Sequence, residues 1–272
     1  MLTVRSSMKE KLLQLIRFGW NQALSCMFAV VIFAAMALTH FVELPFIPRY
    51  DFLLLVCIMM QWILIRTKLE TIDELKVIIV FHLIGLVLEL YKVHIGSWSY
   101  PAEGWLKFGG VPIYSGFMYA SVASYVCQAW RRFQLTITGW PPPVLSIGLS
   151  AAIYLNFFTN HYIYDIRYVL MIALLPVFGR AVVSFTVGSR AYKMPMIVSY
   201  LLIGFFIWIA ENISTYLKVW KYPNQEAAWQ VVHWGKIGSW FLLIIISVII
   251  VVELKRLKET LNHSGKRSDV IR

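Results

Sequence analysis

Charged residues are scarce in this sequence. Only 14% of the 272 residues are Asp, Glu, Lys or Arg, whereas about a quarter of a soluble globular chain is charged. Apolar residues make up 59% of the chain, and its mean hydropathy is +0.68. They fall in runs long enough to cross about 30 Å of hydrocarbon. The composition excludes an ordinary soluble domain. It predicts one membrane domain over residues 1–272, with the lipid bilayer around it.

Acidic residues and cysteines are scarcer still. The chain has 14 Asp and Glu against 25 Lys and Arg, a net charge of +11. In a soluble protein this excess would suggest nucleic acid. Here the basic residues lie mainly between and after the apolar runs, so membrane topology explains them and no nucleic-acid partner is expected. The three cysteines, Cys26, Cys57 and Cys127, lie inside apolar segments and have neither zinc-site nor disulfide spacing.

Prolines, glycines and charges divide the apolar sequence into segments. We expect an all-α, polytopic transmembrane bundle of about eight helices. The first apolar run is too long for a signal peptide, so we expect it to be an uncleaved helix. Pro176 predicts a kink in the sixth helix. The helices are expected at residues 18–43, 50–66, 75–96, 111–130, 142–160, 165–185, 195–216 and 236–254.

The basic residues are distributed unevenly over the predicted loops. With eight crossings, 18 of the 25 Lys and Arg residues fall on the side that holds both termini. The positive-inside rule places that side in the cytoplasm. We therefore expect a multi-pass protein of the bacterial cytoplasmic membrane with both termini cytoplasmic. Residues 255–272 should form a basic cytoplasmic tail beside anionic lipid head groups.

An internal repeat is the most informative pattern. The pattern Glu-x8-Trp-x-Tyr-Pro begins at Glu89 and again at Glu211, 122 residues later. It predicts two tandem halves, residues 1–140 and 141–254, with four helices each. An even number of helices gives both copies the same orientation, so we expect a pseudo-twofold axis along the membrane normal.

Earlier positions follow the same duplication. Thr39-His40-Phe41 corresponds to Asn160-His161-Tyr162, and Tyr50-Asp51 corresponds to Tyr164-Asp165. The offset between the halves changes along the chain. The first half should therefore have a longer first outer loop, and the second half a longer stretch between its second and third helices.

Glu89 and Glu211 are the candidate catalytic residues. Each is predicted about two helical turns inside the outer end of an apolar helix, roughly 10 Å below the interface. An ionisable side chain at such a depth normally faces the bundle interior or a wet cavity. A carboxyl group there can serve as a general acid or base. The alternative is a structural carboxyl group bonded to the Trp, Tyr or backbone of its own repeat.

The aromatic residues that follow each Glu are candidate substrate-binding residues. Trp98, Tyr100, Trp220 and Tyr222 keep the same spacing from their Glu in both halves. Aromatic faces can shape an apolar pocket. Interfacial Trp and Tyr are also the usual anchors of a membrane protein, and that alternative stays open.

His40, His161, Asp51 and Asp165 are candidate supporting residues at the outer ends of the helices. No His-x3-His or His-Glu-x2-His spacing places two ligands on one helix face, so we expect no metal site. No cofactor is identified. Capping explains the two aspartates as well as function does, because each is expected to begin a helix.

The stretch GLVLELYKVHIGSWSYPAEGWLKFGGVPIYSGFMYASV resembles an uncharacterised family of bacterial integral membrane proteins, typified by YoaT of Bacillus. The same stretch is similar to carotenoid hydratase and cyclase-like membrane enzymes, through Glu89, Gly96, Trp98, Tyr100 and Gly110-Val111-Pro112. That similarity implies a carboxylic acid that protonates or hydrates a polyene inside the bilayer. The Pro-x-Glu-Glu signature of the small lycopene cyclases is missing.

Three functions stay open. The first is an intramembrane enzyme that acts on an isoprenoid or other lipid by carboxylate acid/base chemistry. The second is a proton-coupled transporter or carrier that uses the paired Glu residues. The third is a non-catalytic scaffold or sensor. An enzyme of this kind requires its carboxyl groups on an apolar cavity with lateral lipid access, whereas a carrier requires polar lining that continues to the cytoplasmic side.

Overall fold

The computed structural model describes residues 8–269, with side chains described over residues 8–256. The α-helices are α1 (Met8–Ser25), α2 (Met27–Phe41), α3 (Arg49–Arg66), α4 (Ile72–His94), α5 (Ser115–Arg132), α6 (Pro143–Thr159), α7 (Arg167–Phe178), α8 (Met196–Tyr216) and α9 (Gly235–Asp269). The strands are β1 (Lys107–Phe108), β2 (Val111–Pro112), β3 (Thr136–Thr138), β4 (Val182–Val187) and β5 (Arg190–Pro195), and one 3-10 turn, η1, spans Pro223–Gln225. An all-α bundle was predicted. A mostly helical chain is confirmed, but the strands show that the chain is not all-α.

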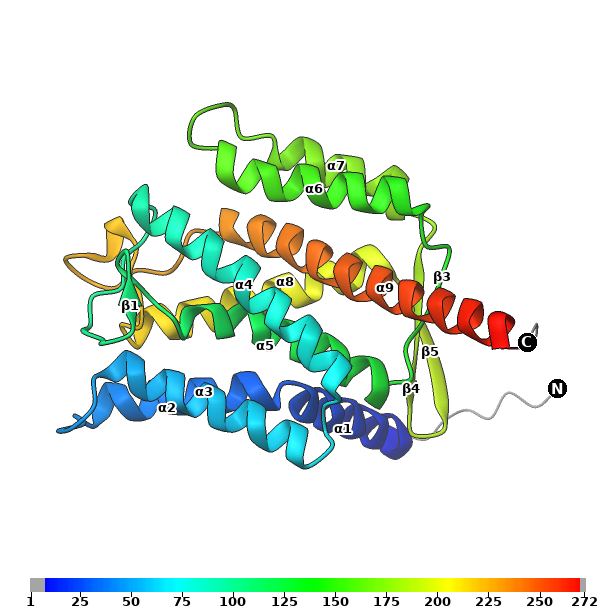
Figure 1. Cartoon of the computed structure of the whole chain (residues 1–272), viewed down its shortest axis with the longest axis horizontal. Helices are drawn as coiled ribbons and strands as arrows, with labels where there is room; N and C mark the ends of the chain where they lie inside the picture. The colour runs from blue at the N-terminus through cyan, green and yellow to red at the C-terminus, as the bar shows by residue number, and fades with distance from the viewer. Residues whose placement is uncertain (1–7, 270–272) are drawn as a thin grey trace.

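The helices form three groups (Figure 1). α4, α5, α8 and α9 lie in the middle, with α1 to α3 on one side and the α6–α7 pair on the other. One apolar core joins the middle helices to α6 and α7. A second core joins α2 and α3 to the loops at the end of the bundle that carries β1 and β2.

Two glycines allow the middle helices to pack closely. A Cβ atom on Gly85 of α4 would overlap the ring of Tyr119 on α5. A Cβ atom on Gly204 of α8 would lie 2.9 Å from the backbone nitrogen of Phe241 on α9. Small residues let membrane helices approach one another in this way. The pairs α4–α5 and α8–α9 therefore depend on these two positions.

Within the described residues, three helices are long and apolar enough to cross a membrane. They are α4, α8 and residues Gly235–Arg256 of α9. α1 and α2 pass the same test together, although they are bent by 69° at Cys26. The other apolar helices α6 and α7 have only 17 and 12 residues. A helical membrane protein is thus supported, and eight crossings stay a prediction.

The first predicted helix is wrong in its start and its continuity. The chain becomes helical at Met8, and the bend at Cys26 divides residues 18–43 between α1 and α2. α1 carries Lys9, Lys11 and Arg17 beside exposed apolar side chains such as Trp20. A helix with both kinds of residue on its surface suits a membrane interface better than the hydrocarbon core.

The sixth predicted helix is also wrong beyond its first half. α7 ends at Phe178, two residues after Pro176, and β4 begins at Val182. β4 pairs antiparallel with β5 from Val182↔Pro195 to Val187↔Arg190, and β3 pairs with the other edge of β4. The segment VVSFTV is rich in β-branched residues, which favour strands. The hairpin lies between α7 and α8. The predicted duplication calls for extra residues in this stretch, and the duplication stays a prediction.

The fourth helix begins at Ser115, later than the predicted residue 111. Gly109 and Gly110 both have positive φ values, 56° and 81°, and they form the turn between β1 and β2. A two-residue turn with two positive φ angles favours a hairpin. Val111 and Pro112 therefore lie in a strand rather than in the helix.

The two ends of the bundle differ. β3, β4 and β5 mark one end, here called the sheet end, and β1, β2 and residues 217–234 mark the other, here called the loop end (Figure 1). α1 begins and α9 finishes at the sheet end. An even number of crossings requires this, but the side of the membrane that the sheet end faces stays a prediction.

Candidate functional site

Glu89 lies on α4 toward the loop end and is only 3% exposed. Its Oε2 accepts hydrogen bonds from Trp98 Nε1 at 2.7 Å and from Tyr100 OH at 2.8 Å. Its Oε1 accepts one from Tyr119 OH at 2.8 Å. Two of these donors follow Glu89 in its own repeat, and the third comes from α5. The carboxyl group is therefore buried, and both of its oxygens are hydrogen-bonded.

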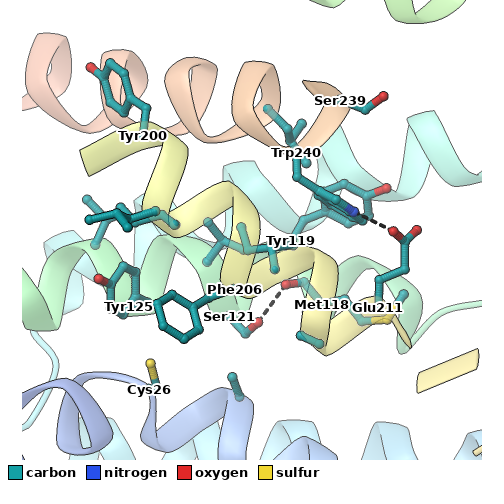
Figure 2. A pocket seen from close by; sticks show the side chains of 18 of the residues that line it. Cys26, Met118, Tyr119, Ser121, Tyr125, Tyr200, Phe206, Glu211, Ser239 and Trp240 are labelled. Carbon is teal, nitrogen blue, oxygen red and sulfur yellow. Dashed lines mark hydrogen bonds between the residues drawn. The ribbon is translucent and has the colours of Figure 1, made fainter. Parts of the chain in front are cut away.

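Glu211 has the corresponding place on α8 and is also 3% exposed. Its Oε1 accepts a hydrogen bond from Tyr222 OH, and its Oε2 accepts one from Trp240 Nε1 of α9 at 2.6 Å. Figure 2 shows the indole of Trp240 directed at this carboxyl group. Glu89 and Glu211 thus each accept a hydrogen bond from the Tyr that lies eleven residues later in the chain.

The same helix ending precedes both aromatic segments. Gly96 has a φ of 73° and Lys218 a φ of 55°. The next residue in each case, Ser97 or Val219, donates its N–H to a carbonyl five residues earlier. A left-handed residue followed by such a bond is a common way to end a helix. It turns each chain back so that the following Trp and Tyr reach the carboxyl group.

The two aromatic segments meet each other. Ser99 and Lys221 exchange two backbone hydrogen bonds of 3.0 Å. The ring of Trp98 contacts that of Tyr222 with 6.0 Å between centroids. Tyr100 and Trp220 make the reciprocal contact at 6.4 Å. Each aromatic segment therefore places its Trp against the Tyr of the other segment.

Both carboxyl groups line one large cavity of about 1010 Å³. Its wall is mainly apolar and is formed by α1, α2, α5, α8 and the sheet, with members such as Phe18, Phe33, Phe133, Phe185 and Phe206. Figure 2 shows part of this wall beside Glu211. At the loop end the lining becomes polar and includes Lys92, Asn160, Asp165, Arg167 and Lys236. The cavity is therefore amphipathic along its length.

Residues 14–248 match the family described as "Protein of unknown function (DUF817)". The chain belongs to this family. It is similar to the "Uncharacterized protein YoaT" of Bacillus subtilis (strain 168), with 57% identity over 246 residues, which cover 90% of this chain and 93% of the relative. The family resemblance read from the sequence is confirmed, and it brings no established activity.

Two solved structures resemble this DUF817 protein more distantly. One is a cross-linked trimer of a variant of MvINS, with 12% identity and a TM-score of 0.46. The other is the mycobacterial Insig homolog MvINS from Mycobacterium vanbaalenii, with 14% identity and a TM-score of 0.44. Both likenesses cover 66% of this chain and 93% of the solved chain.

The predicted substrate-binding residues are brought together, but not all reach the cavity. Trp98, Trp220 and Tyr222 line it. Tyr100 does not, because it lies behind Glu89 in the second core. Burial and the neighbouring Glu89 raise the pKa of Tyr100 well above its usual value. Burial and Glu211 have the same effect on the pKa of Tyr222. Both phenols therefore stay protonated and donate to their carboxyl groups.

Only two of the four predicted supporting residues line the cavity. His161 and Asp165 line the cavity, whereas His40 and Asp51 do not. The ring of His40 packs instead against Phe41. Asp51 accepts hydrogen bonds from the backbone of Trp105 and Leu106, at 2.7 and 2.9 Å, and so holds the loop before β1.

Asp165 has different partners from Asp51. It accepts hydrogen bonds from Asn156 Nδ2 at 3.1 Å and from the backbone and side chain of Arg167, at 3.0 and 2.5 Å. Burial raises the pKa of Asp165, but these bonds outweigh burial and the pKa is lowered overall. Its charged form is therefore the favoured one at neutral pH.

Five residues at the site were missed from the sequence. Tyr119 and Trp240 hold the carboxyl groups, and Lys92, Arg167 and Lys236 line the loop end of the cavity. Tyr119 and Trp240 lie outside the Glu-x8-Trp-x-Tyr-Pro pattern and differ in residue type, so a search for identical repeated residues does not find them. The three cations look like interfacial charges in the sequence. Among the described residues, no three His, Cys, Asp or Glu side chains gather as a metal site.

Proposed function

We propose that this DUF817 protein binds a lipid or isoprenoid in its cavity and acts on it by acid/base chemistry of Glu89 and Glu211. The observation that carries the proposal is the place of Glu89 and Glu211 in the wall of one largely apolar cavity of about 1010 Å³. This volume lies at the upper end of the range for small-molecule sites. A buried carboxyl group with a positioned substrate is the arrangement that proton transfer requires.

Lateral access supports a lipid ligand. Val30 of α2 and the α8 residues Leu202 and Phe206 line the cavity and are also 54%, 46% and 64% exposed. These accessible apolar side chains of α2 and α8 are of the kind that a lateral opening toward lipid requires. In a bilayer these side chains face acyl chains, so a hydrophobic ligand can enter without crossing water.

The hydrogen bonds leave each carboxyl group able to take part in proton transfer. An indole N–H can only donate, so the oxygen facing each Trp must accept. Each carboxyl oxygen offers about two acceptor positions. Glu211 uses one position on each oxygen, and Glu89 leaves one on Oε1. The faces of Trp98, Trp220 and Tyr222 can stabilise a developing positive charge, as the similarity to carotenoid-modifying enzymes implies.

The proposal includes a duplicated architecture with both Trp-x-Tyr segments on the outer side of the bacterial cytoplasmic membrane and both termini in the cytoplasm. Residues 1–140 and 141–254 would be the two halves. The matched helix endings, the matched Glu–Tyr bonds and the reciprocal bonds of Ser99 and Lys221 support it. A pseudo-twofold axis would pass between Ser99 and Lys221, and the two halves would share one site.

The test compares total organic extracts of cells that express the wild type, Glu89→Gln or Glu211→Gln. Glu253→Gln is the matched control, because Glu253 accepts hydrogen bonds from Trp140 and Ser146 at the sheet end and does not line the cavity. We expect a lipid or isoprenoid species to change with the wild type and the control, but not with the other two variants. Identical extracts at equal protein levels would sink the enzymatic proposal.

A carrier is the second candidate, because the cavity extends from Trp98 at the loop end to Phe185 of the sheet. Substrate flux in vesicles that depends on Glu89 and Glu211, without any new lipid species, would favour it. The apolar side chains Phe133, Leu135 and Ile137 line the sheet end of the cavity, so a polar permeant fits poorly. Unchanged extracts and unchanged flux would leave the scaffold or sensor.

A further inference from the structure

Three cationic side chains converge at the loop end of the cavity. Lys92 lies in the last turn of α4, Arg167 is the first residue of α7, and Lys236 is the second residue of α9. All three line the same cavity. Like charges brought together from three helices repel one another, and the repulsion is strongest where water is scarce. An anion bound nearby would offset this repulsion.

The protein supplies only part of that compensation. Arg167 Nε pairs with Asp165 Oδ2 at 2.5 Å, and Arg167 NH1 donates to Ser239 Oγ at 3.1 Å. Lys92 Nζ donates to the neutral amide oxygen of Asn160 at 3.1 Å. Within the described residues, Asp165 is therefore the one carboxylate that pairs directly with the cluster, while Glu89 and Glu211 act on the charge of Lys236 from beyond 4.0 Å.

Lys236 has aromatic neighbours in place of a carboxylate. Its Nζ lies 5.0 Å from the ring centroid of Trp98 and 4.5 Å from that of Tyr222. In the described part of the chain, neither Lys236 nor Lys92 has a carboxylate oxygen within 4.0 Å. The nearby oxygens of Glu89 and Glu211 are bonded to Trp and Tyr donors. Both ammonium groups keep donors available for a ligand.

Two helix dipoles add to the same field. α7 begins at Arg167 and α9 at Gly235, so both positive helix ends lie beside the cluster. The N-terminus of a helix attracts an anion through its dipole and its free N–H groups. Charges and dipoles of one sign thus meet the apolar cavity at its polar end.

We propose that the cavity ligand carries an anionic head group, a phosphate or a carboxylate, held by Lys92, Arg167 and Lys236 while its apolar tail lies along the wall toward the sheet. The inference rests on the proposed lipid or isoprenoid ligand and names its head-group class. A neutral hydrocarbon would leave the three cations facing an apolar molecule. An amphiphile matches both ends of the cavity.

The test compares two lipids with the same acyl chains, phosphatidic acid and diacylglycerol, which differ only in the phosphate. Binding to the purified full-length protein in detergent is measured by native mass spectrometry. We expect phosphatidic acid to bind about tenfold more tightly, because charge-assisted hydrogen bonds to the phosphate are strong. Equal binding of the two lipids overturns the inference.

Matched variants identify the cations responsible. Lys92→Gln and Lys236→Gln, made separately, should each reduce phosphatidic acid binding about tenfold and leave diacylglycerol binding unchanged. Lys218→Gln is the control, because Lys218 is an exposed residue of the same end that does not line the cavity. Lys92→Arg should restore binding. If both Gln variants keep the wild-type melting temperature and the wild-type affinity for phosphatidic acid, the site is overturned.

Inorganic phosphate separates a lipid head group from free phosphate. If phosphate alone raises the melting temperature of the wild type but not of Lys236→Gln, and phosphatidic acid adds nothing, the proposal that the bound head group belongs to a lipid is overturned.

The glutamate variants separate this inference from the proposed function. If Glu89→Gln and Glu211→Gln bind phosphatidic acid normally while no extract changes, the acid/base function fails and the head-group site stands. If extracts depend on the glutamates but both lipids bind alike, only the head-group inference fails.

Discussion

The two carboxyl groups have similar partners but different surroundings. On one side, Arg49 donates hydrogen bonds to the carbonyls of Leu217 and Lys218 and to Thr39, and so joins the loop ends of α2 and α8. On the other side, Asn160, which the predicted duplication matches with Thr39, accepts a hydrogen bond from Lys92 at the cavity. Arg49 therefore closes one side of the bundle, whereas Lys92 lines the cavity on the other side. In the proposed duplication, the features that the two halves share position the carboxyl groups, and the features that differ between them form the binding site.

The largest expected effect on stability comes from removing the carboxyl groups, because each accepts hydrogen bonds from buried donors. Glu89 accepts three side-chain hydrogen bonds and Glu211 accepts two. Glu89→Leu should lower the free energy of unfolding by ~3 kcal/mol or more, and Glu211→Leu by about 1 kcal/mol less, because each abandoned donor is buried. Thermal unfolding in detergent measures both. An unchanged melting temperature for Glu89→Leu would show that these bonds contribute nothing net.

The next effect compares the two glycine contacts. Gly85→Ala pushes against a side chain, Tyr119, whereas Gly204→Ala pushes against the backbone of Phe241. We expect a loss of about 1–3 kcal/mol for each, with the larger loss for Gly85→Ala, because its added Cβ would lie 2.7 Å from Tyr119 Cβ and would overlap the ring more closely than the 2.9 Å contact at Gly204. Gly148→Ala is the control, since nothing lies within 4 Å of its added Cβ. Equal melting temperatures for all three variants would contradict the close packing of both pairs.

A smaller effect on stability distinguishes Arg49, which joins two helices, from Lys92, which lines the cavity. Arg49→Gln should cost about 1–2 kcal/mol of unfolding free energy, because it removes bonds that join α2 to α8. Lys92→Gln should leave stability unchanged or raise it slightly, because it relieves repulsion at the cation cluster. Melting temperatures without added lipid check the contrast. A larger loss for Lys92→Gln would make that residue structural.

The smallest effect concerns pH. The pKa of Asp165 is lowered in the folded protein, so its contribution is present above the unfolded pKa, about 3.9. It disappears as the pH falls through the lower folded value. Wild type should therefore melt above Asp165→Asn at pH 7, and the two should converge below about pH 4. A difference that is constant with pH would assign the effect of Asp165 to packing.

The sequence by itself determined the membrane class, most of the helices and the Glu–Trp–Tyr pattern. Long apolar runs and repeated spacing are local properties, so they can be read without the fold. The boundaries that failed, at residues 18–43 and 165–185, lie where a bend or a strand competes with an apolar helix. The length and hydropathy of a segment do not distinguish these outcomes, because hairpin pairing depends on residues outside the segment.

Only the tertiary structure decided which side chains share a site. Tyr119 and Trp240 reach the carboxyl groups because α5 and α9 pack against α4 and α8. Lys92, Arg167 and Lys236 are separated by 75 and 69 residues along the chain, yet they line one cavity. Burial, hydrogen bonding and charge repulsion act through space. Spacing along one chain therefore identified the repeated carboxyl groups but could not identify the cations that face their cavity.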